Sequence, residues 1–294
     1  MSASHEIELI ANYQCKCGEN PLWDERRHCL FWTDIPTGRL FCFDHASGRH
    51  APIYRGEPVG GFTLEEDGAV MLFRVADVAR MGDEGEQPVP LIEFADEGVP
   101  RFNDVIAAPD GTVFAGTMGK DGRGGVYHVD HARVVRNLWR GTNCSNGMAF
   151  TADLKTFYWT DTTHRVIYRY DYDAESGRVA NPRPFVEFGA GAPGPDGMTL
   201  DAEERVYSAR FGGAEVTVFD GSGSEVERIA VPAEKVTACT FGGPRMDELY
   251  ITTAGGDPDA DAGEGAEAPP DGGLYRVRLN TTGRPEFRST IGVA

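Results

Sequence analysis

The chain has 294 residues, of which 46 are acidic and 28 are basic, so its formal net charge is −18. A surface this acidic repels nucleic acid and anionic membranes, and neither is expected as a partner. Hydrophobic residues make up 40% of the chain, which is enough for a folded core. No apolar run reaches the ~18 residues that a membrane-spanning helix requires.

The N-terminal stretch MSASHEIELIANYQC has neither a basic start nor a long apolar segment, so we expect no secretory signal and a cytoplasmic location. In that compartment the six cysteines are expected to be free thiols. Cys29, Cys42 and Cys239 lie inside hydrophobic runs, where a reduced cysteine acts as a small core residue. The pair Cys15-x-Cys17 lacks a second pair with the spacing of a zinc site.

Short aromatic and β-branched runs alternate with glycine and proline along the whole chain, and no stretch keeps a helical period. The chain is therefore predicted to be nearly all β. One pattern of strand, turn, strand, gap and strand recurs at intervals of about 40–50 residues. The units begin at Glu19, Gly60, Asn103, Asn146, Asp196 and Thr237.

Four strands in ~40–45 residues is the length of one propeller blade. We therefore predict one domain over residues 1–294, a six-bladed β-propeller with four antiparallel strands in each blade. The early stretch HEIELIA precedes the first unit and is expected to add the outermost strand of the last blade, which closes the ring. A polar insertion from Ala254 to Gly273 interrupts the sixth unit and is expected to be a solvated loop.

In a propeller the first strand of every blade lines the central channel, so the six starting positions are expected to form a ring. Glu19 and Asp196 bring carboxylates to this ring, and Asn103 and Asn146 bring carboxamides. Carboxylates this close repel each other unless a cation lies between them, and no Lys or His occupies the ring. A divalent metal held by Glu19, Asn146 and Asp196 is one solution. A water-filled polar channel without a metal is the other.

Nucleophilic catalysis is not favoured by the sequence. It contains neither a G-x-S-x-G motif nor an H-E-x-x-H motif. Cys144 lies two residues before Asn146, but no histidine is near it in sequence, and we interpret it as a packing residue. His164 follows a predicted strand and is expected on a surface turn.

Several short motifs occur in the same order as in a known family, and they cover essentially the whole chain. They are GENPLW, RFND, GTM, SNGMAF and PDGMTLD. The set resembles the senescence marker protein 30/gluconolactonase/luciferin-regenerating-enzyme family. The resemblance implies a six-bladed propeller with a divalent metal in its channel.

By the same resemblance, Glu19, Asn146 and Asp196 match the metal ligands of the family. Arg101 and Asn103 match its substrate-contacting residues. The first motif departs from the pattern at Asn20, where a Gly is common, and this leaves the substrate preference open.

The expected activity is metal-dependent hydrolysis of a sugar (aldono-) lactone to the aldonic acid, with the attacking water activated either by the metal or by Asp196 as the general base. One divalent ion, Ca²⁺, Zn²⁺, Mn²⁺ or Mg²⁺, is the expected cofactor, and a small sugar lactone is the expected partner. A propeller hydrolase for organophosphates or other lactones, or a non-catalytic calcium-binding propeller, remains an alternative. The lactone, the physiological metal and the oligomeric state stay open.

Overall fold

The computed structural model describes residues 5–82, 86–257 and 271–293. Within these ranges all regular structure is β, apart from one 3₁₀ turn, η1 (Ile35–Thr37). Strands form antiparallel sheets in which chain neighbours pair with each other. The expectation of an all-β fold built from four-stranded antiparallel sheets is confirmed. Most of the polar insertion lies outside the described residues, so its predicted loop structure is not covered.

Four sheets have four strands each, in chain order from the inside outwards. The first contains β2 (Gly18–Asp24), β3 (Cys29–Asp34), β4 (Arg39–Asp44) and β5 (His50–Arg55). The second contains β6 (Val59–Leu64), β7 (Val70–Arg74), β8 (Asp77–Met81) and β9 (Val89–Glu93). The third contains β10 (Arg101–Ala107), β11 (Val113–Met118), β12 (Gly124–Val129) and β13 (Val135–Thr142). The fourth contains β14 (Ser145–Phe150), β15 (Thr156–Asp161), β16 (Val166–Asp173) and β17 (Arg178–Glu187).

The remaining strands belong to one eight-stranded sheet. One part contains β18 (Gly194–Leu200), β19 (Val206–Phe211), β20 (Glu215–Phe219) and β21 (Glu225–Ala230). The other contains β22 (Lys235–Gly242), β23 (Glu248–Ala254), β24 (Gly273–Arg278) and β1 (Ile7–Asn12). The two parts join through a single residue pair, Phe211 with Lys235. The N-terminal strand β1 pairs with β24 at the outer edge, as the stretch HEIELIA predicts.

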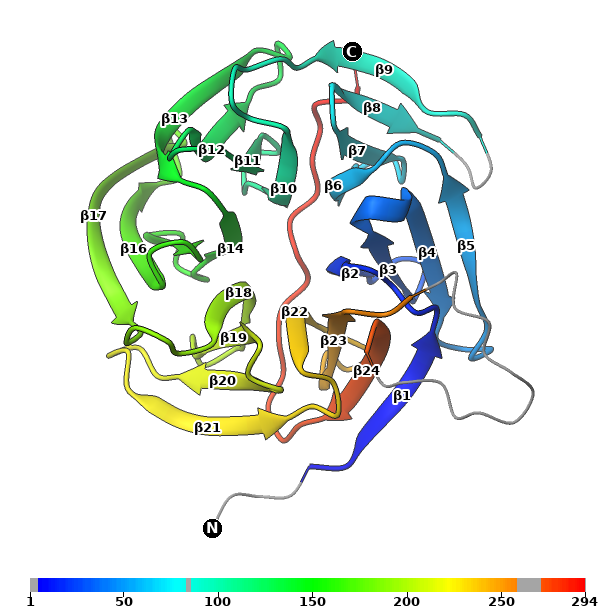
Figure 1. Cartoon of the computed structure of the whole chain (residues 1–294). Helices are drawn as coiled ribbons and strands as arrows, with labels where there is room; N and C mark the ends of the chain where they lie inside the picture. The colour runs from blue at the N-terminus through cyan, green and yellow to red at the C-terminus, as the bar shows by residue number, and fades with distance from the viewer. Residues whose placement is uncertain (1–4, 83–85, 258–270, 294) are drawn as a thin grey trace.

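The sheets stand around a common centre in a propeller-like arrangement (Figure 1). The innermost strands β2, β6, β10, β14, β18 and β22 contact one another in that cyclic order. Inner strands such as β3 are buried at every position, whereas an outer strand such as β5 is mostly exposed. An inner strand packs against neighbouring sheets on both faces, which explains its nearly continuous hydrophobic sequence.

The segment that follows β24 leaves the last sheet and crosses the centre of the ring (Figure 1). Arg288 in this segment is 8% exposed, and its Nη2 lies 2.6 Å from Asp24 Oδ1. Ser289 donates from Oγ to the buried Glu65 carboxylate at 2.5 Å. These contacts hold the C-terminal segment across one end of the central channel. Among the described residues no helix is long and apolar enough to cross a membrane.

Candidate active site in the central channel

Each innermost strand carries a β-bulge where it reaches the centre of the ring. The shift in register follows Glu19 in β2, encloses Asn103 in β10, follows Asn146 in β14 and encloses Asp196 in β18. Strands β6 and β22 have the same irregularity around Gly60 and Thr237. A bulge interrupts pairing and re-aims the side chains beside it. The bulges therefore lie at the positions that the sequence repeat marks.

The structure buries the four polar ring positions predicted from the sequence. Glu19 is 5% exposed, Asn103 4%, Asn146 3% and Asp196 5%. The two other ring positions contribute no ligand group. Gly60 has no side chain, and Thr237 donates from Oγ1 to the carbonyl oxygen of Gly18 at 2.6 Å, within the wall between sheets.

The glycine that follows Asn146 and Asp196 in the motifs has a packing reason. A Cβ on Gly147 would lie 2.6 Å from the carbonyl oxygen of Asp196, and one on Gly197 would lie 2.5 Å from Cβ of Ala238. Neighbouring innermost strands thus approach too closely for any side chain at these points. In each dipeptide, Asn-Gly or Asp-Gly, the first residue brings a polar side chain to the channel. The glycine after it leaves room for the innermost strand of the neighbouring sheet.

A line of hydrogen bonds connects the predicted substrate and metal residues. Nη1 of Arg101 donates to Oδ1 of Asn103 at 2.6 Å. Nδ2 of Asn103 donates to Oδ1 of Asn146 at 2.5 Å and to the carbonyl oxygen of Ser145 at 2.8 Å. Arg101, Asn103 and Asn146 therefore form one connected group.

The channel carboxyl groups are destabilised in their charged form. Burial raises the pKa of Glu19, and the neighbouring charge of Asp104 raises it further. Burial, followed by the charges of Glu19 and Asp104, raises the pKa of Asp196 well above its ordinary value. The Arg101 guanidinium opposes both shifts without cancelling them. Three acidic groups thus share a space that is short of positive charge.

One acceptor in this space has no partner. Oδ1 of Asp196 is buried and accepts no hydrogen bond. Such an orphaned carboxylate oxygen costs free energy unless a proton, a donor or a cation satisfies it. Among the described residues no three His, Cys, Asp or Glu side chains form a group able to hold a metal ion. A cation here would need the neutral oxygen of Asn146 beside the two carboxylates of Glu19 and Asp196.

Asp104 is a channel residue that sequence reasoning missed. It lies beside Asn103 in the β10 bulge, and a bulge leaves two consecutive residues without cross-strand partners. Burial raises the pKa of its carboxyl group to about 7. The available signal was an aspartate inside a strand, where that residue type is depleted.

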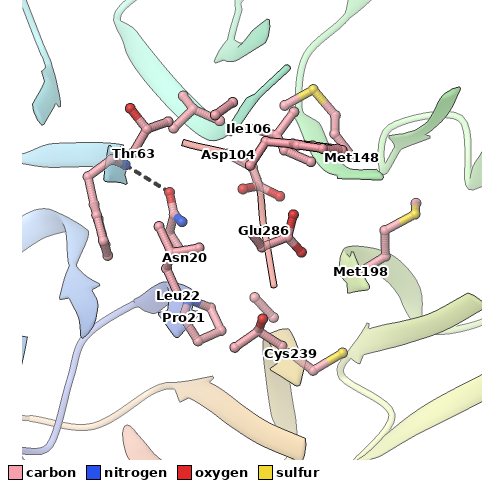
Figure 2. A pocket seen from close by; sticks show the side chains of 16 residues that line it. Asn20, Pro21, Leu22, Thr63, Asp104, Ile106, Met148, Met198, Cys239 and Glu286 are labelled. Carbon is pink, nitrogen blue, oxygen red and sulfur yellow. Dashed lines mark hydrogen bonds between the residues drawn. The ribbon is translucent and has the colours of Figure 1, made fainter. Parts of the chain in front are cut away.

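Glu286 is a second acidic channel residue that sequence reasoning missed, and it comes from the C-terminal segment. Asn20, Asp104 and Glu286 point into one cavity of about 40 Å³, which Met148, Met198 and Cys239 also line (Figure 2). Burial, followed by the charge of Asp104, raises the pKa of Glu286 to about 7. A cavity of this size has room for a few ordered water molecules.

Asn20, at the departure from the family pattern, has a conformational explanation. Its φ of 50° lies in the left-handed region, which Asn tolerates better than any other residue except Gly. Its Oδ1 accepts a hydrogen bond from the backbone N–H of Phe62 at 2.8 Å, which ties β2 to β6 (Figure 2).

The remaining sequence interpretations concern thiols and histidine. None of the six cysteines is in a disulfide, in agreement with the expected reduced thiols. Cys144 does more than pack: Nδ2 of Asn146 donates to its sulfur at 3.3 Å, and burial, followed by the charge of Asp196, raises its pKa to about 12. A thiol with this pKa is a poor nucleophile at neutral pH. The side chain of His164 is 56% exposed in a turn after β15, as predicted.

Several known proteins resemble this chain in sequence. Residues 17–255 match the sequence model of the SMP-30/Gluconolactonase/LRE-like region. The pentonolactonase XacC of Haloferax volcanii is 43% identical over 97% of this chain and 98% of its own length. Regucalcin of Xenopus laevis is 30% identical over 94% of this chain and 95% of its own.

Solved structures repeat the fold. The calcium-binding protein regucalcin from Agrobacterium tumefaciens superposes with a TM-score of 0.89 at 24% identity, over 98% of this chain and 99% of that one. The family model covers most of the chain, and a relative above 40% identity matches nearly all of it. This chain therefore belongs to the SMP-30/gluconolactonase/LRE-like family.

Proposed function

We propose that the protein is a sugar lactonase, a hydrolase that opens the internal ester of an aldonolactone to the aldonic acid. One observation carries the proposal: two buried carboxylates and a carboxamide face one channel, and one carboxylate oxygen of Asp196 is unpartnered. The family membership and the similarity to a pentonolactonase support a sugar lactone as the substrate class.

The donor set fits a divalent cation. Glu19 and Asp196 would supply charged oxygens, and Asn146 would supply its neutral Oδ1, a combination suited to Ca²⁺, Mg²⁺ or Mn²⁺ and acceptable to Zn²⁺. A cation would also offset the repulsion that raises the pKa values of Glu19 and Asp196. Similarity to proteins named regucalcin, one of them described as calcium-binding, supports the same assignment. When bound, the ion would supply Lewis-acid polarisation of the ester carbonyl.

The protein side chains would orient the substrate and move the proton. Arg101 is half-buried beside Asn103, and its guanidinium would present N–H donors to sugar hydroxyls. Both N–H protons of Asn103 go to Asn146 and Ser145, so Asn103 would hold the guanidinium through Oδ1 and could meet the substrate only as an acceptor. Asp196 would accept the proton of the attacking water on the carboxylate oxygen that is not used to hold the ion. The same group would then return the proton to the leaving ring oxygen.

We further propose that the fold is one six-bladed propeller over residues 1–294. The eight-stranded sheet would count as two blades, since Phe211 and Lys235 are the one residue pair that joins its halves. Six cysteines outside any disulfide are consistent with a reducing compartment, and we propose the cytoplasm as the location.

A lactone panel with defined metals tests the proposed function. Protein treated with a chelator should lose acid release from pentono- and hexonolactones and regain it with one of the four ions. A rate above spontaneous hydrolysis that survives chelation would overturn the metal requirement. A metal-dependent rise in Tm without turnover of any lactone would instead identify a calcium-binding protein that is not a lactonase.

A further inference from the structure

The Asn146 side chain lies within a chain of hydrogen bonds that crosses three innermost strands. On one side its Oδ1 accepts from Nδ2 of Asn103, which in turn is held by Arg101. On the other side its Nδ2 donates to Oγ1 of Thr162 at 2.9 Å. Thr162 then donates from Oγ1 to the carbonyl oxygen of Pro195 at 2.7 Å, one residue before Asp196.

The two ends of this chain determine its direction. The Arg101 guanidinium can only donate, and the carbonyl oxygen of Pro195 can only accept. Thr162 has a single hydroxyl proton, which is committed to Pro195, so Thr162 must accept from Asn146. The NH₂ group of Asn146 therefore faces Thr162, and its carbonyl oxygen faces the opposite side, toward Asn103.

We infer that Thr162 is a positioning residue that holds the Asn146 amide with Oδ1 available to the cation. The inference rests on the proposed function, since it assumes that Asn146 is a ligand. A side-chain amide binds a cation only through its oxygen, and a rotated amide would present N–H groups instead. The Thr162 hydroxyl also restrains the backbone at Pro195, just before Asp196. It therefore links the neutral ligand Asn146 to the charged ligand Asp196, which belongs to the next sheet.

Single substitutions separate this role from packing. Thr162→Val keeps the side-chain shape and removes the hydroxyl, whereas Thr162→Ser keeps the hydroxyl. Thr160→Val is the matched control, because Thr160 lies on β15, is fully buried and has an Oγ1 without a hydrogen-bond partner. Metal binding is measured by calorimetry on chelator-treated protein with Ca²⁺ and Mn²⁺, and kcat and KM are measured separately. Thr162→Val is expected to raise the metal Kd about 10–100-fold, whereas Thr162→Ser and Thr160→Val should stay close to wild type.

A double substitution tests the orientation itself. A carboxylate at position 146 presents oxygen in either orientation, so Asn146→Asp should make metal binding insensitive to Thr162→Val. If Thr162→Val does not fold, Thr162→Ala replaces it in both backgrounds. An unchanged Kd in Thr162→Val, failure of Thr162→Ser to restore binding, or an equal loss in the Asn146→Asp background would each overturn the inference. Absence of metal binding in the wild-type protein would instead overturn the proposed function.

Discussion

Asn103 donates a hydrogen bond from Nδ2 to Oδ1 of Asn146 at 2.5 Å, which joins the bulges of β10 and β14. Asn103 is the expected substrate contact, and Asn146 is the expected metal ligand. The two sites are therefore physically coupled, and a substitution at Asn103 is expected to disturb the position of the Asn146 side chain.

Replacement of Asn103 should impair catalysis more than metal binding. Asn103→Ala removes the acceptor that holds the Arg101 guanidinium and one support of Asn146, while Thr162 still holds the other end of the Asn146 amide. We expect kcat/KM to fall about 10–100-fold, which corresponds to about 1.4–2.8 kcal/mol, with a smaller change in metal Kd. Steady-state kinetics and calorimetry measure the two effects. The control is Asn137→Ala on the exposed outer strand β13, and equal kinetics for the two variants would contradict the prediction.

Asp196→Asn should have opposite effects on activity and on the stability of the metal-free protein. Activity should fall at least about 100-fold, because the variant loses the general base and one charged ligand. The metal-free variant should be more stable than wild type by about 1–3 kcal/mol, since a neutral amide replaces a carboxylate whose charge is disfavoured by burial and by Glu19 and Asp104. Initial rates with metal and urea unfolding with chelator measure the two effects.

The control for this variant is Asp121→Asn, at a turn position outside the channel. It should change neither quantity. A metal-free Asp196→Asn protein that is less stable than wild type would show that the Asp196 carboxylate contributes favourably to the fold, contrary to the observed lack of a partner.

Glu286 should make stability decline between acidic and neutral pH. Its pKa is raised from 4.5 to about 7 in the folded protein, mainly by burial. The folded state therefore holds a proton that the unfolded state releases, and stability falls as the pH rises from about 4.5 to about 7, then levels off. Glu286→Gln removes this loss. The free energy of unfolding of Glu286→Gln should match that of wild type near pH 4 and exceed it at pH 8 by up to about 3 kcal/mol.

Urea unfolding of chelator-treated protein at several pH values measures this effect. Glu93→Gln, at an exposed position on the outer strand β9, serves as the control. Its free energy of unfolding should change with pH in the same way as that of wild type. A constant difference between Glu286→Gln and wild type at all pH values would mean that the carboxyl does not titrate in this range.

Much of the fold follows from local sequence. Gly-Met after Asn146 and after Asp196, turn dipeptides such as Asp-Gly and the regular spacing indicate strand positions, and the structure confirms the four-stranded antiparallel sheets. Because every repeat occupies an equivalent place around the centre, the polar first residues of four repeats are also predictable as channel residues, whereas Gly60 has no side chain and Thr237 bonds within the wall between sheets. The burial of Glu19, Asn103, Asn146 and Asp196 agrees with that logic.

Asp104 and Glu286 were not predictable in this way. Asp104 reaches the channel because a bulge re-aims two consecutive side chains of β10, and strand alternation would have placed it on the opposite face from Asn103. Glu286 belongs to no repeat and arrives on the segment that crosses the ring.

The sequence by itself determined which residues repeat, because strand period and turn chemistry are local properties. Only the tertiary structure decided which carboxyl groups share the channel and how the Asn146 amide is turned. Those features depend on contacts between sheets that are distant in sequence, where burial and neighbouring charges control pKa values and hydrogen-bond direction.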